Sequence, residues 1–285
     1  MAVNNSLSKT KGNQRLGLTA YLTQEAVKNQ INNVIGGSNG QRFISSIISA
    51  VQTTPALQEC TNQSILSGAL LGESLKLSPS PQLGHYYLVP FNDKDRGKVA
   101  QFQLGYKGYI QLAVRSGYYK KLNVLAIKEC ELINFDPLNE EIKVNLIEDE
   151  EARENAPTIG YYAMFEYTNG FRKAIYWSKA KMEAHANKYS AGYRAKKGYT
   201  FWERDFDGMA FKTMLRQLIS KWGIMSIDMQ NAISSDMAVI NEDGTKDYVD
   251  NKDDVIEQEA KIIEEPATEE VEPVQDDVSS ALFGK

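Results

Sequence analysis

The chain has 285 residues, of which 42% are apolar, 10% aromatic and 24% charged, so it is too apolar for an intrinsically disordered protein and allows one large domain or two small ones. Its formal net charge of −5 divides unevenly, with +6 over residues 1–240 and −11 over residues 241–285. The sequence has no run of 18 apolar residues and no apolar leader near its start, so we expect a soluble, cytoplasmic protein without membrane contact.

Three helices are predicted in the first quarter of the chain. Apolar residues recur at helical spacing over residues 23–35, where Thr23 is placed to cap the helix and Gly36 to end it. A second apolar face spans residues 43–51, and a third covers residues 64–75. These segments favour a helical N-terminal part.

The pattern then changes to short runs rich in tyrosine, valine and phenylalanine. Residues 85–91 and 98–104 flank a polar turn and predict a β-hairpin, and a helix over 106–116 follows. The best turn signal in the chain is Asn169-Gly170, which favours a type I′ hairpin. The remaining predicted strands span residues 122–127, 142–147, 159–167 and 171–177.

The last predicted elements are helical. Ser178 is placed to cap a helix that runs to about residue 188, and a long final helix covers residues 201–222, with Gly208 as a break near its start. N-terminal helices, a central and mostly antiparallel sheet with β-hairpins, and a long C-terminal core helix predict an α+β fold.

Metal and nucleotide chemistry lack supporting motifs. His85 and His185 lie far apart in sequence, as do the two cysteines, which argues against a zinc site. The glycine-rich segment at residues 36–40 follows a helix and lacks the P-loop pattern, so we expect neither ATP use nor a cofactor.

One alternative remains open in the region of the fourth predicted strand. Asp136, Glu141 and Lys143 have the residue types of a metal-dependent nuclease site. Such sites usually place the first aspartate on a different strand, and five residues leave little room for this. Solvated charges at the start of a strand are the simpler interpretation.

Residues 171–222 combine cations with aromatic residues. They contain twelve lysines and arginines against four carboxylates, together with all three tryptophans. Cations follow phosphates while rings stack on exposed bases, so this composition favours binding of single-stranded nucleic acid. The alternative is a basic surface over an ordinary aromatic core.

The predicted final helix separates these two roles. Its apolar residues share one face, which predicts that Trp222 belongs to the core and is a poor stacking partner. Lys212 and Arg216 lie one turn apart on the polar face, which contains no carboxylate. We therefore expect both cations to point outward, toward an external anion.

Residues 103–121 form a second basic and aromatic cluster. Gly105 and Gly108 flank Tyr106 and Lys107, so the backbone and the lysine can approach a phosphate closely. A G-x-x-G pattern also occurs in KH modules, which leaves an RNA-binding module as another alternative.

The two clusters together resemble a known family. GYKGYIQLAVRSG (residues 105–117) and MAFKTMLRQLISKWG (residues 209–223) are similar to segments of the RecT family of phage and prophage single-strand annealing proteins, and the similarity spans about residues 40–235. This resemblance implies ATP-independent annealing of complementary DNA strands by an oligomer, as a ring or a helical filament. Such a protein binds DNA in homologous recombination and is not an enzyme.

The resemblance also implies partners and site residues. The expected partners are single-stranded DNA, annealed duplex DNA and a phage exonuclease, with a host single-strand binding protein as a further candidate. Matching positions point to backbone contacts by Lys107, Arg115, Lys212, Thr213 and Arg216. The full set of candidate DNA-binding residues is Tyr106, Lys107, Arg115, Lys120, Lys121, Arg172, Lys196, Lys197, Trp202, Arg204, Lys212, Thr213, Arg216 and Lys221.

We expect the chain to have three parts. Residues 1–35 form an N-terminal arm and helix that contacts another subunit, and residues 36–235 form the DNA-binding and annealing core. Residues 236–285 form a flexible acidic tail, because their many carboxylates and few large apolar residues cannot offset the entropy of ordering. Leu282-Phe283 is a candidate anchor in a partner's groove.

Overall fold

The computed structural model describes residues 16–36, 39–93 and 95–248, which belong to one compact unit. The first part of the expected N-terminal arm lies outside the described residues. So does the acidic segment after residue 248, including Leu282 and Phe283.

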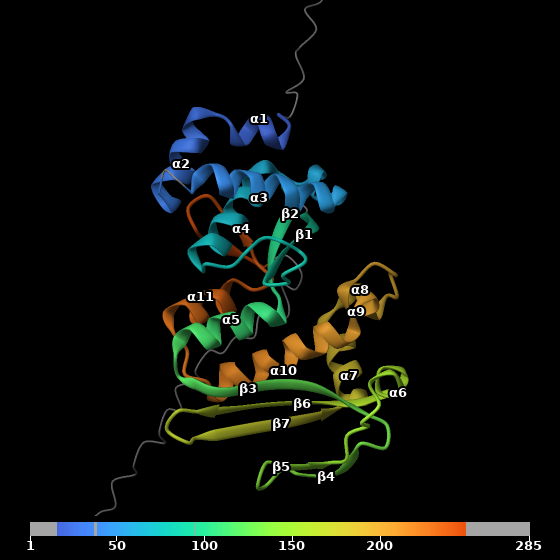
Figure 1. The fold of residues 1–285 in the computed structure, drawn as a ribbon. Helices are drawn as coiled ribbons and strands as arrows, with labels where there is room; N and C mark the ends of the chain where they lie inside the picture. The colour runs from blue at the N-terminus through green and yellow to red at the C-terminus, as the bar shows by residue number, and fades with distance from the viewer. Residues whose placement is uncertain (1–15, 37–38, 94, 249–285) are drawn as a thin grey trace, which may run out of the picture. The chain divides into compact units, whose positions relative to one another are not determined.

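The N-terminal part is helical, as expected (Figure 1). Thr23 ends the first helix instead of capping the second, whose N-cap residue is Gln24. Thr61 caps the last of these helices, where its side chain accepts a hydrogen bond from the backbone N–H of Ser64. The elements are α1 (Leu18–Leu22), α2 (Glu25–Ile35), α3 (Gly40–Thr53), the 3-10 helix η1 (Pro55–Glu59) and α4 (Asn62–Ser74).

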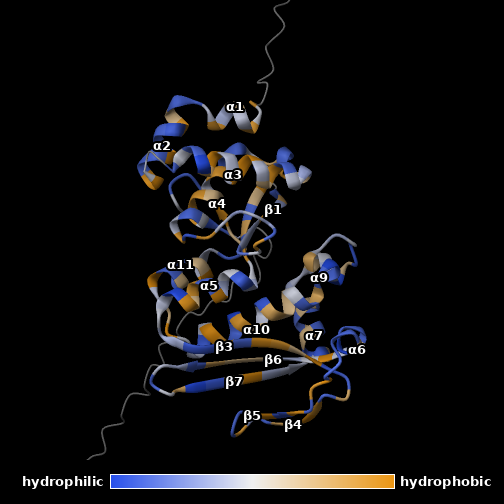
Figure 2. Cartoon of the chain, viewed as in Figure 1, coloured by the Kyte–Doolittle hydropathy of each residue, from blue (hydrophilic) through white to orange (hydrophobic). Residues whose placement is uncertain are grey.

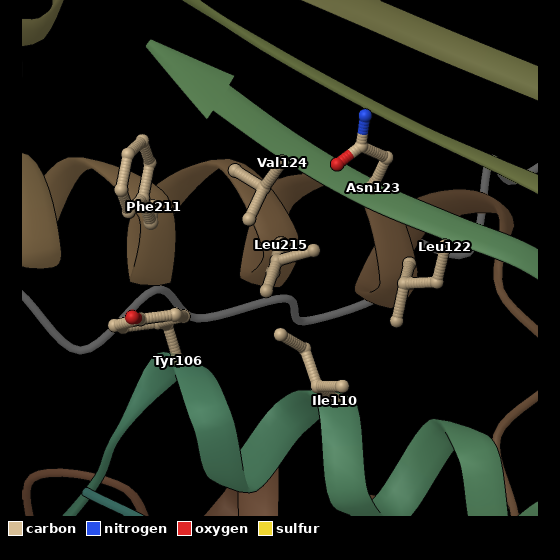
Figure 3. A pocket seen from close by; sticks show the side chains of 7 residues that line it. All are labelled: Tyr106, Ile110, Leu122, Asn123, Val124, Phe211 and Leu215. Carbon is tan, nitrogen blue, oxygen red and sulfur yellow. The ribbon is translucent and has the colours of Figure 1, made fainter. Parts of the chain in front are cut away.

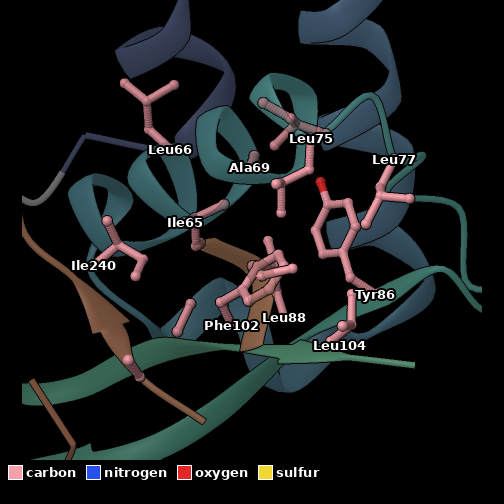
Figure 4. Packing of buried hydrophobic residues seen from close by; sticks show 14 of the residues in the cluster. Ile65, Leu66, Ala69, Leu75, Leu77, Tyr86, Leu88, Phe102, Leu104 and Ile240 are labelled. Carbon is pink, nitrogen blue, oxygen red and sulfur yellow. The ribbon is translucent and has the colours of Figure 1, made fainter. Parts of the chain in front are cut away.

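The first predicted hairpin packs on α4. Strands β1 (Tyr86–Asp93) and β2 (Gly97–Leu104) pair antiparallel. Tyr86 and Phe102 stack with their ring centres 5.0 Å apart, and they belong to the same buried cluster as the apolar residues of α4 (Figure 4). The predicted helix over 106–116 follows as α5 (Tyr106–Ser116).

The C-terminal segment returns to this hairpin. The backbone N–H of Phe102 donates to the Ala238 carbonyl at 2.8 Å, and β8 (Val239–Ile240) pairs with β9 (Lys246–Asp247). The predicted start of the flexible tail at residue 236 is therefore too early. Ala238 and Ile240 belong to the N-terminal core cluster, and Val239 is also buried.

A three-stranded antiparallel sheet forms the second half of the unit. Its strand order is β3 (Tyr119–Lys128), β6 (Thr158–Tyr167), β7 (Arg172–Ser178). A separate hairpin of β4 (Leu132–Asp136) and β5 (Glu141–Val144), followed by α6 (Glu150–Asn155), connects β3 to β6. The α+β class is confirmed, although the strands of the described residues form several small antiparallel sheets.

The turn between β6 and β7 lies at the predicted residues but differs in type. The N–H of Gly170 donates to the Tyr167 carbonyl at 3.0 Å, and Gly170 has a positive φ of 88° whereas Asn169 does not. A type I′ turn requires positive φ at both central residues, so the prediction of that type is wrong. The connection is a three-residue loop in which only the glycine is left-handed.

The predicted long final helix is divided in two at Asp205. The carboxylate of this residue accepts a hydrogen bond from the N–H of Gly208 at 2.9 Å, so Asp205 caps the second helix and the break precedes Gly208. The C-terminal helices are α7 (Lys179–Tyr189), α8 (Ala191–Arg194), α9 (Phe201–Arg204), α10 (Phe206–Trp222) and α11 (Ile227–Ser235).

Helix α10 connects the two halves of the core. Leu215 and Ile219 pack with the N-terminal helices and hairpin, whereas Met214 and Leu218 pack with the sheet. Apolar residues therefore recur around much of α10 (Figure 2). Within the described ranges, no helix is long and apolar enough to cross a membrane.

Candidate nucleic-acid interface

The start of α5 is pressed against the start of β1. A Cβ atom on Gly105 would lie 2.1 Å from the Gly84 carbonyl oxygen, and one on Gly108 would lie 2.1 Å from the His85 carbonyl oxygen. The N–H of Gly105 donates to this His85 carbonyl at 2.9 Å. Close backbone packing explains both glycines, so their spacing is not by itself evidence for a phosphate-binding loop.

An open cleft of about 190 Å³ lies between α5 and β3, with α10 at its base (Figure 3). Its wall on α5 includes Tyr106, whose ring contacts Phe211 of α10 edge-on at 5.6 Å. Such a cleft presents an aromatic side chain and an apolar base to a planar ligand. The lining residues are Tyr106, Ile110, Leu122, Asn123, Val124, Phe211 and Leu215.

Two exposed cations lie on α5 beside the residues that line the cleft. Lys107 is exposed, and its Nζ lies 6.0 Å from the centre of the Tyr106 ring. Arg115 donates to the carbonyls of Leu75 (2.6 Å) and Lys76 (3.2 Å), so it partly serves to cap α4. Burial lowers the pKa of His85, and the charges of Arg115 and Lys107 lower it further. Lys107 and Arg115 thus both lie near His85.

The second motif lies differently from the sequence prediction. Lys212 is only 7% exposed, and its Nζ is 2.8 Å from Asp236 Oδ1. Arg216 Nη1 lies 2.7 Å from Asp236 Oδ2, and Thr213 is buried with its hydroxyl donating to the Met209 carbonyl. The prediction that Lys212 and Arg216 point outward is wrong, because Asp236 supplies an internal partner.

Asp236 is the buried partner of these cations that the sequence analysis did not identify. Its buried carboxylate also accepts hydrogen bonds from the N–H of Leu104 at 2.9 Å and the hydroxyl of Tyr109 at 3.4 Å. It thus joins β2, α5 and α10 through one side chain. The only hint in the sequence is that Lys212 and Arg216 have no carboxylate on their own helix face.

The tryptophans exchange their predicted roles. Trp202 is 6% exposed and packs against Phe206 at 5.1 Å between ring centres, so it cannot stack on a base in this conformation. Trp222, predicted to be core, is 39% exposed because it is the last residue of α10 and lies past the buried part of the helix. Lys173 Nζ lies 4.4 Å from the centre of its ring.

The remaining candidate cations occupy two other surfaces. Lys120 and Lys121 of β3 share Glu166 of β6, with Nζ to carboxylate distances of 2.6 and 3.7 Å. Arg172 donates to the Tyr162 hydroxyl at 3.3 Å, and Lys221 is exposed at the end of α10. Lys196, Lys197 and Arg204 are exposed around α8 and α9.

The residues of the nuclease alternative lie in the β4–β5 hairpin. Asp136 and Glu141 are paired across it, and the Asp136 carboxylate accepts hydrogen bonds from the backbone N–H of Leu138 (2.8 Å) and the side-chain amide of Asn139 (2.7 Å). Asp136 thus closes the hairpin turn. In the part of the chain that the structure describes, no group of three histidines, cysteines or carboxylates is arranged to hold a metal ion.

The α+β core, with its cleft between α5 and β3 and with α10 packed on both halves, is the part of the chain that the comparison with known families covers. The RecT family model matches residues 41–256, and the chain belongs to this family. It is 40% identical over 254 residues to the uncharacterized protein YqaK of Bacillus subtilis, covering 87% of this chain and 82% of that one. It is 29% identical over 241 residues to Protein RecT of Escherichia coli, covering 81% and 86% respectively. The resemblance found in the sequence is confirmed.

Proposed function

We propose that the protein binds single-stranded DNA and anneals complementary strands during phage homologous recombination. It acts in the cytoplasm, without ATP, as an oligomer on DNA, and receives single strands from a phage exonuclease. A host single-strand binding protein is a further partner. The observation that carries this proposal is membership of the RecT family over three quarters of the chain.

The cleft between α5 and β3 is the proposed position of the strand. Tyr106 presents a ring to a base, and Lys107, with its Nζ 6.0 Å from that ring, neutralises the neighbouring phosphate. An aromatic and apolar cleft beside a cation suits bases of any sequence, as annealing requires.

Lys212 and Arg216 have a different role in this proposal. Both are directed to Asp236 and hold α10 against α5 and β2, so they position the base of the cleft without contacting the phosphates. The RecT-like second motif is then a structural motif beneath the binding site.

Annealing follows from charge neutralisation. Two single strands repel each other through their phosphates, and cations on successive subunits lower that repulsion while the bases stay accessible. Base pairing then supplies the sequence specificity. In this mechanism no covalent bond is made or broken.

The direct test uses two complementary labelled strands mixed with the full chain in the absence of ATP. We expect duplex formation faster than without protein, and strands of unchanged length after incubation with Mg²⁺. Shortened strands would support the nuclease alternative. Preferential displacement of the DNA by an RNA competitor would support the RNA-binding alternative.

A single lysine tests the position of the strand. Lys107→Ala should weaken binding of every DNA sequence and make the slope of log K against log salt less steep by about 0.7, the value per neutralised phosphate on single strands. Lys143→Ala is the matched control, because this exposed lysine lies on the β4–β5 hairpin. Equal slopes for the two variants would remove Lys107 from the interface.

A further inference from the structure

One end of the sheet β3-β6-β7 carries a concentration of negative charge. The segment of α6 is exposed and hydrophilic (Figure 2). Its one cation, Arg153, turns inward, with Nε 2.7 Å from Glu131 Oε1 and Nη2 2.9 Å from the Ala126 carbonyl of β3. We call the exposed carboxylates the acidic end, and they are Glu148, Asp149, Glu150, Glu151 and Glu154.

Among the described residues, none of the five carboxylates of the acidic end takes part in an ion pair, although Lys128, Lys179 and Lys181 lie at the same end of the sheet. The Asp149 carboxylate accepts a hydrogen bond from the N–H of Ala152 at 2.6 Å and so fixes the start of α6. Arg153 then anchors the helix to β3. The charges are therefore held on a fixed element and not on a loose loop.

The opposite end of the same sheet is apolar and aromatic at its centre. It comprises the start of β3, the β6–β7 turn and the end of α10. The N–H of Thr168 donates to the Tyr118 carbonyl at 3.1 Å, and the hydroxyl of Tyr119 donates to the Ile224 carbonyl at 3.3 Å. The exposed residues at this centre are Tyr118, Phe171, Trp222 and Ile224.

Cations surround this apolar centre. Lys173 and Lys221 have their Nζ atoms 4.4 and 5.8 Å from the centre of the Trp222 ring, and Lys173 is also ion-paired with Glu140. Lys120 and Lys121 share the single carboxylate of Glu166, which leaves a net positive charge beside them. We call this surface the basic end. An apolar aromatic centre with a charged rim is the composition of a protein interface.

The two ends cannot neutralise each other within one molecule. β3 has ten residues and therefore spans about 30 Å at roughly 3.3 Å per residue. Arg153 of the acidic end contacts the last part of this strand, and Tyr118 and Tyr119 of the basic end begin it. Opposite charges at opposite ends of one rigid sheet favour contacts between molecules.

We propose that the acidic end of one copy of this chain docks on the basic end of the next copy. Such a contact joins two different surfaces, so it repeats head to tail and generates a ring if it closes and a helical filament if it does not. This inference rests on the oligomeric form in the proposed function and specifies which surfaces build it.

A second copy fits these observations better than DNA does. A strand bound to the basic end would leave the acidic end without a partner. The same chain provides both complementary surfaces in equal number. Aliphatic Ile224 beside Trp222 also suits a protein partner, because bases stack on rings and not on branched aliphatic side chains.

The test exchanges charges in the full chain. The acidic-end variant is Glu150→Lys/Glu151→Lys/Glu154→Lys, and the basic-end variant is Lys120→Glu/Lys121→Glu/Lys221→Glu. Sedimentation velocity without DNA measures the concentration of half-association. We expect the concentration of half-association of each variant alone to be higher than that of wild type by about tenfold or more. The reason is that like charges then face each other across the contact.

Mixing provides the decisive measurement. An equimolar mixture of the two variants restores opposite charges at every contact and should regain wild-type assembly, as should one chain carrying all six substitutions. The proposal is overturned if either variant assembles like wild type, or if the mixture fails to recover although both variants keep the wild-type circular dichroism spectrum and thermal midpoint. If a variant unfolds, Trp222→Ser and Glu151→Gln/Glu154→Gln replace the charge reversals, and both must weaken assembly.

The remaining outcomes separate the proposals. A basic-end variant that loses affinity for a short oligonucleotide but assembles normally would make the basic end a nucleic-acid surface and refute head-to-tail docking. A wild-type chain that stays monomeric at all concentrations, with and without DNA, would also refute it. A chain that assembles through its ends but does not anneal would refute the proposed function alone.

Discussion

Asp236 shows how one buried side chain sets the geometry of the candidate site. It receives two cations from α10, a backbone N–H from β2 and a hydroxyl from α5. Burial lowers the pKa of Lys212, and the Asp236 carboxylate opposes that shift by stabilising the charged amine. Removing the Asp236 carboxylate would leave the positive charges of Lys212 and Arg216 uncompensated, which should destabilise the fold.

We therefore expect Asp236→Asn to lower the free energy of unfolding by roughly 3–5 kcal/mol, the usual cost of breaking a buried ion pair. Urea denaturation of the variant and wild type measures this difference. Asp95→Asn is the control, because Asp95 is exposed in the β1–β2 turn and should change stability by less than about 0.5 kcal/mol. Equal unfolding free energies for both variants would show that the network does not stabilise the fold.

His185 is a second residue whose surroundings change a measurable property, the pKa of its ring. Burial lowers its pKa to about 4, with smaller contributions from the charges of Arg216 and Lys188. Its ring lies among those of Trp177, Tyr189 and Trp202. In the unfolded chain the same imidazole has a pKa near 6.5, so between pH 6.5 and 4 the unfolded state binds more protons than the folded state.

The stability contributed by neutral His185 is therefore complete above about pH 6.5 and falls as the pH decreases toward 4. In a His185→Gln variant, unfolding free energies measured between pH 7 and 5 should decline less steeply than in wild type. A His85→Gln variant is the comparison, because His85 is more exposed and should account for less of the decline. An unchanged slope in His185→Gln would show that folding does not lower the pKa of this ring.

At the scale of elements, the packing of α5 on β1 depends on glycine. Gly105 and Gly108 bring the helix backbone so close to Gly84 and His85 that no side chain fits between them. This contact fixes the direction of α5 and thus the position of Tyr106 and the cleft. Gly105 and Gly108 are therefore needed for the shape of the cleft, whichever ligand binds there.

Gly105→Ala should lower the free energy of unfolding by roughly 1–3 kcal/mol, because the added Cβ would overlap the Gly84 carbonyl and the backbone must move. Gly17→Ala is a matched control, since a Cβ there meets no atom within 4 Å and Gly17 has an ordinary φ of −58°. Thermal and urea denaturation compare the two. If Gly105→Ala left the free energy of unfolding unchanged, α5 and β1 would be able to move apart without destabilising the fold.

At the scale of the whole molecule, the last described residues are bound to the first hairpin. Asn241 and Asp247 both bind Arg96 of the β1–β2 turn, at 2.7 and 3.1 Å. Residues 249–285 carry twelve carboxylates against three lysines. In the proposed function, such a segment is repelled by bound DNA and is attracted to the cations of the interface when no DNA is bound.

Two truncations separate the role of the described C-terminal residues from that of the acidic segment. Deleting residues 249–285 should leave the thermal midpoint unchanged, keep or slightly raise annealing at low salt, where screening is weakest, and lower recombination in cells. Deleting residues 241–285 should also lower the thermal midpoint, because it removes the contacts with Arg96. If the shorter deletion binds DNA but no longer anneals it, the acidic segment belongs to the annealing mechanism and not to partner binding.

The sequence by itself determined the elements whose signals are local. Period and turn residues predicted the first hairpin, α5, the β6–β7 hairpin and the cap of α7 at Ser178, because each depends on residues close together in the chain. The two motifs were also sufficient to identify the family, since they preserve a spacing of about a hundred residues.

Only the tertiary structure decided which side chains are available to a ligand. Periodicity assumes one buried face, but α10 is covered on two sides, so Lys212 is turned inward although it occupies a polar position of the pattern. Its partner Asp236 lies 24 residues further along, across a helix and a turn, where no local rule connects them. Trp222 follows the apolar pattern but lies past the end of the core, and Trp202 lies within it, because burial depends on what packs over a residue and not on its spacing.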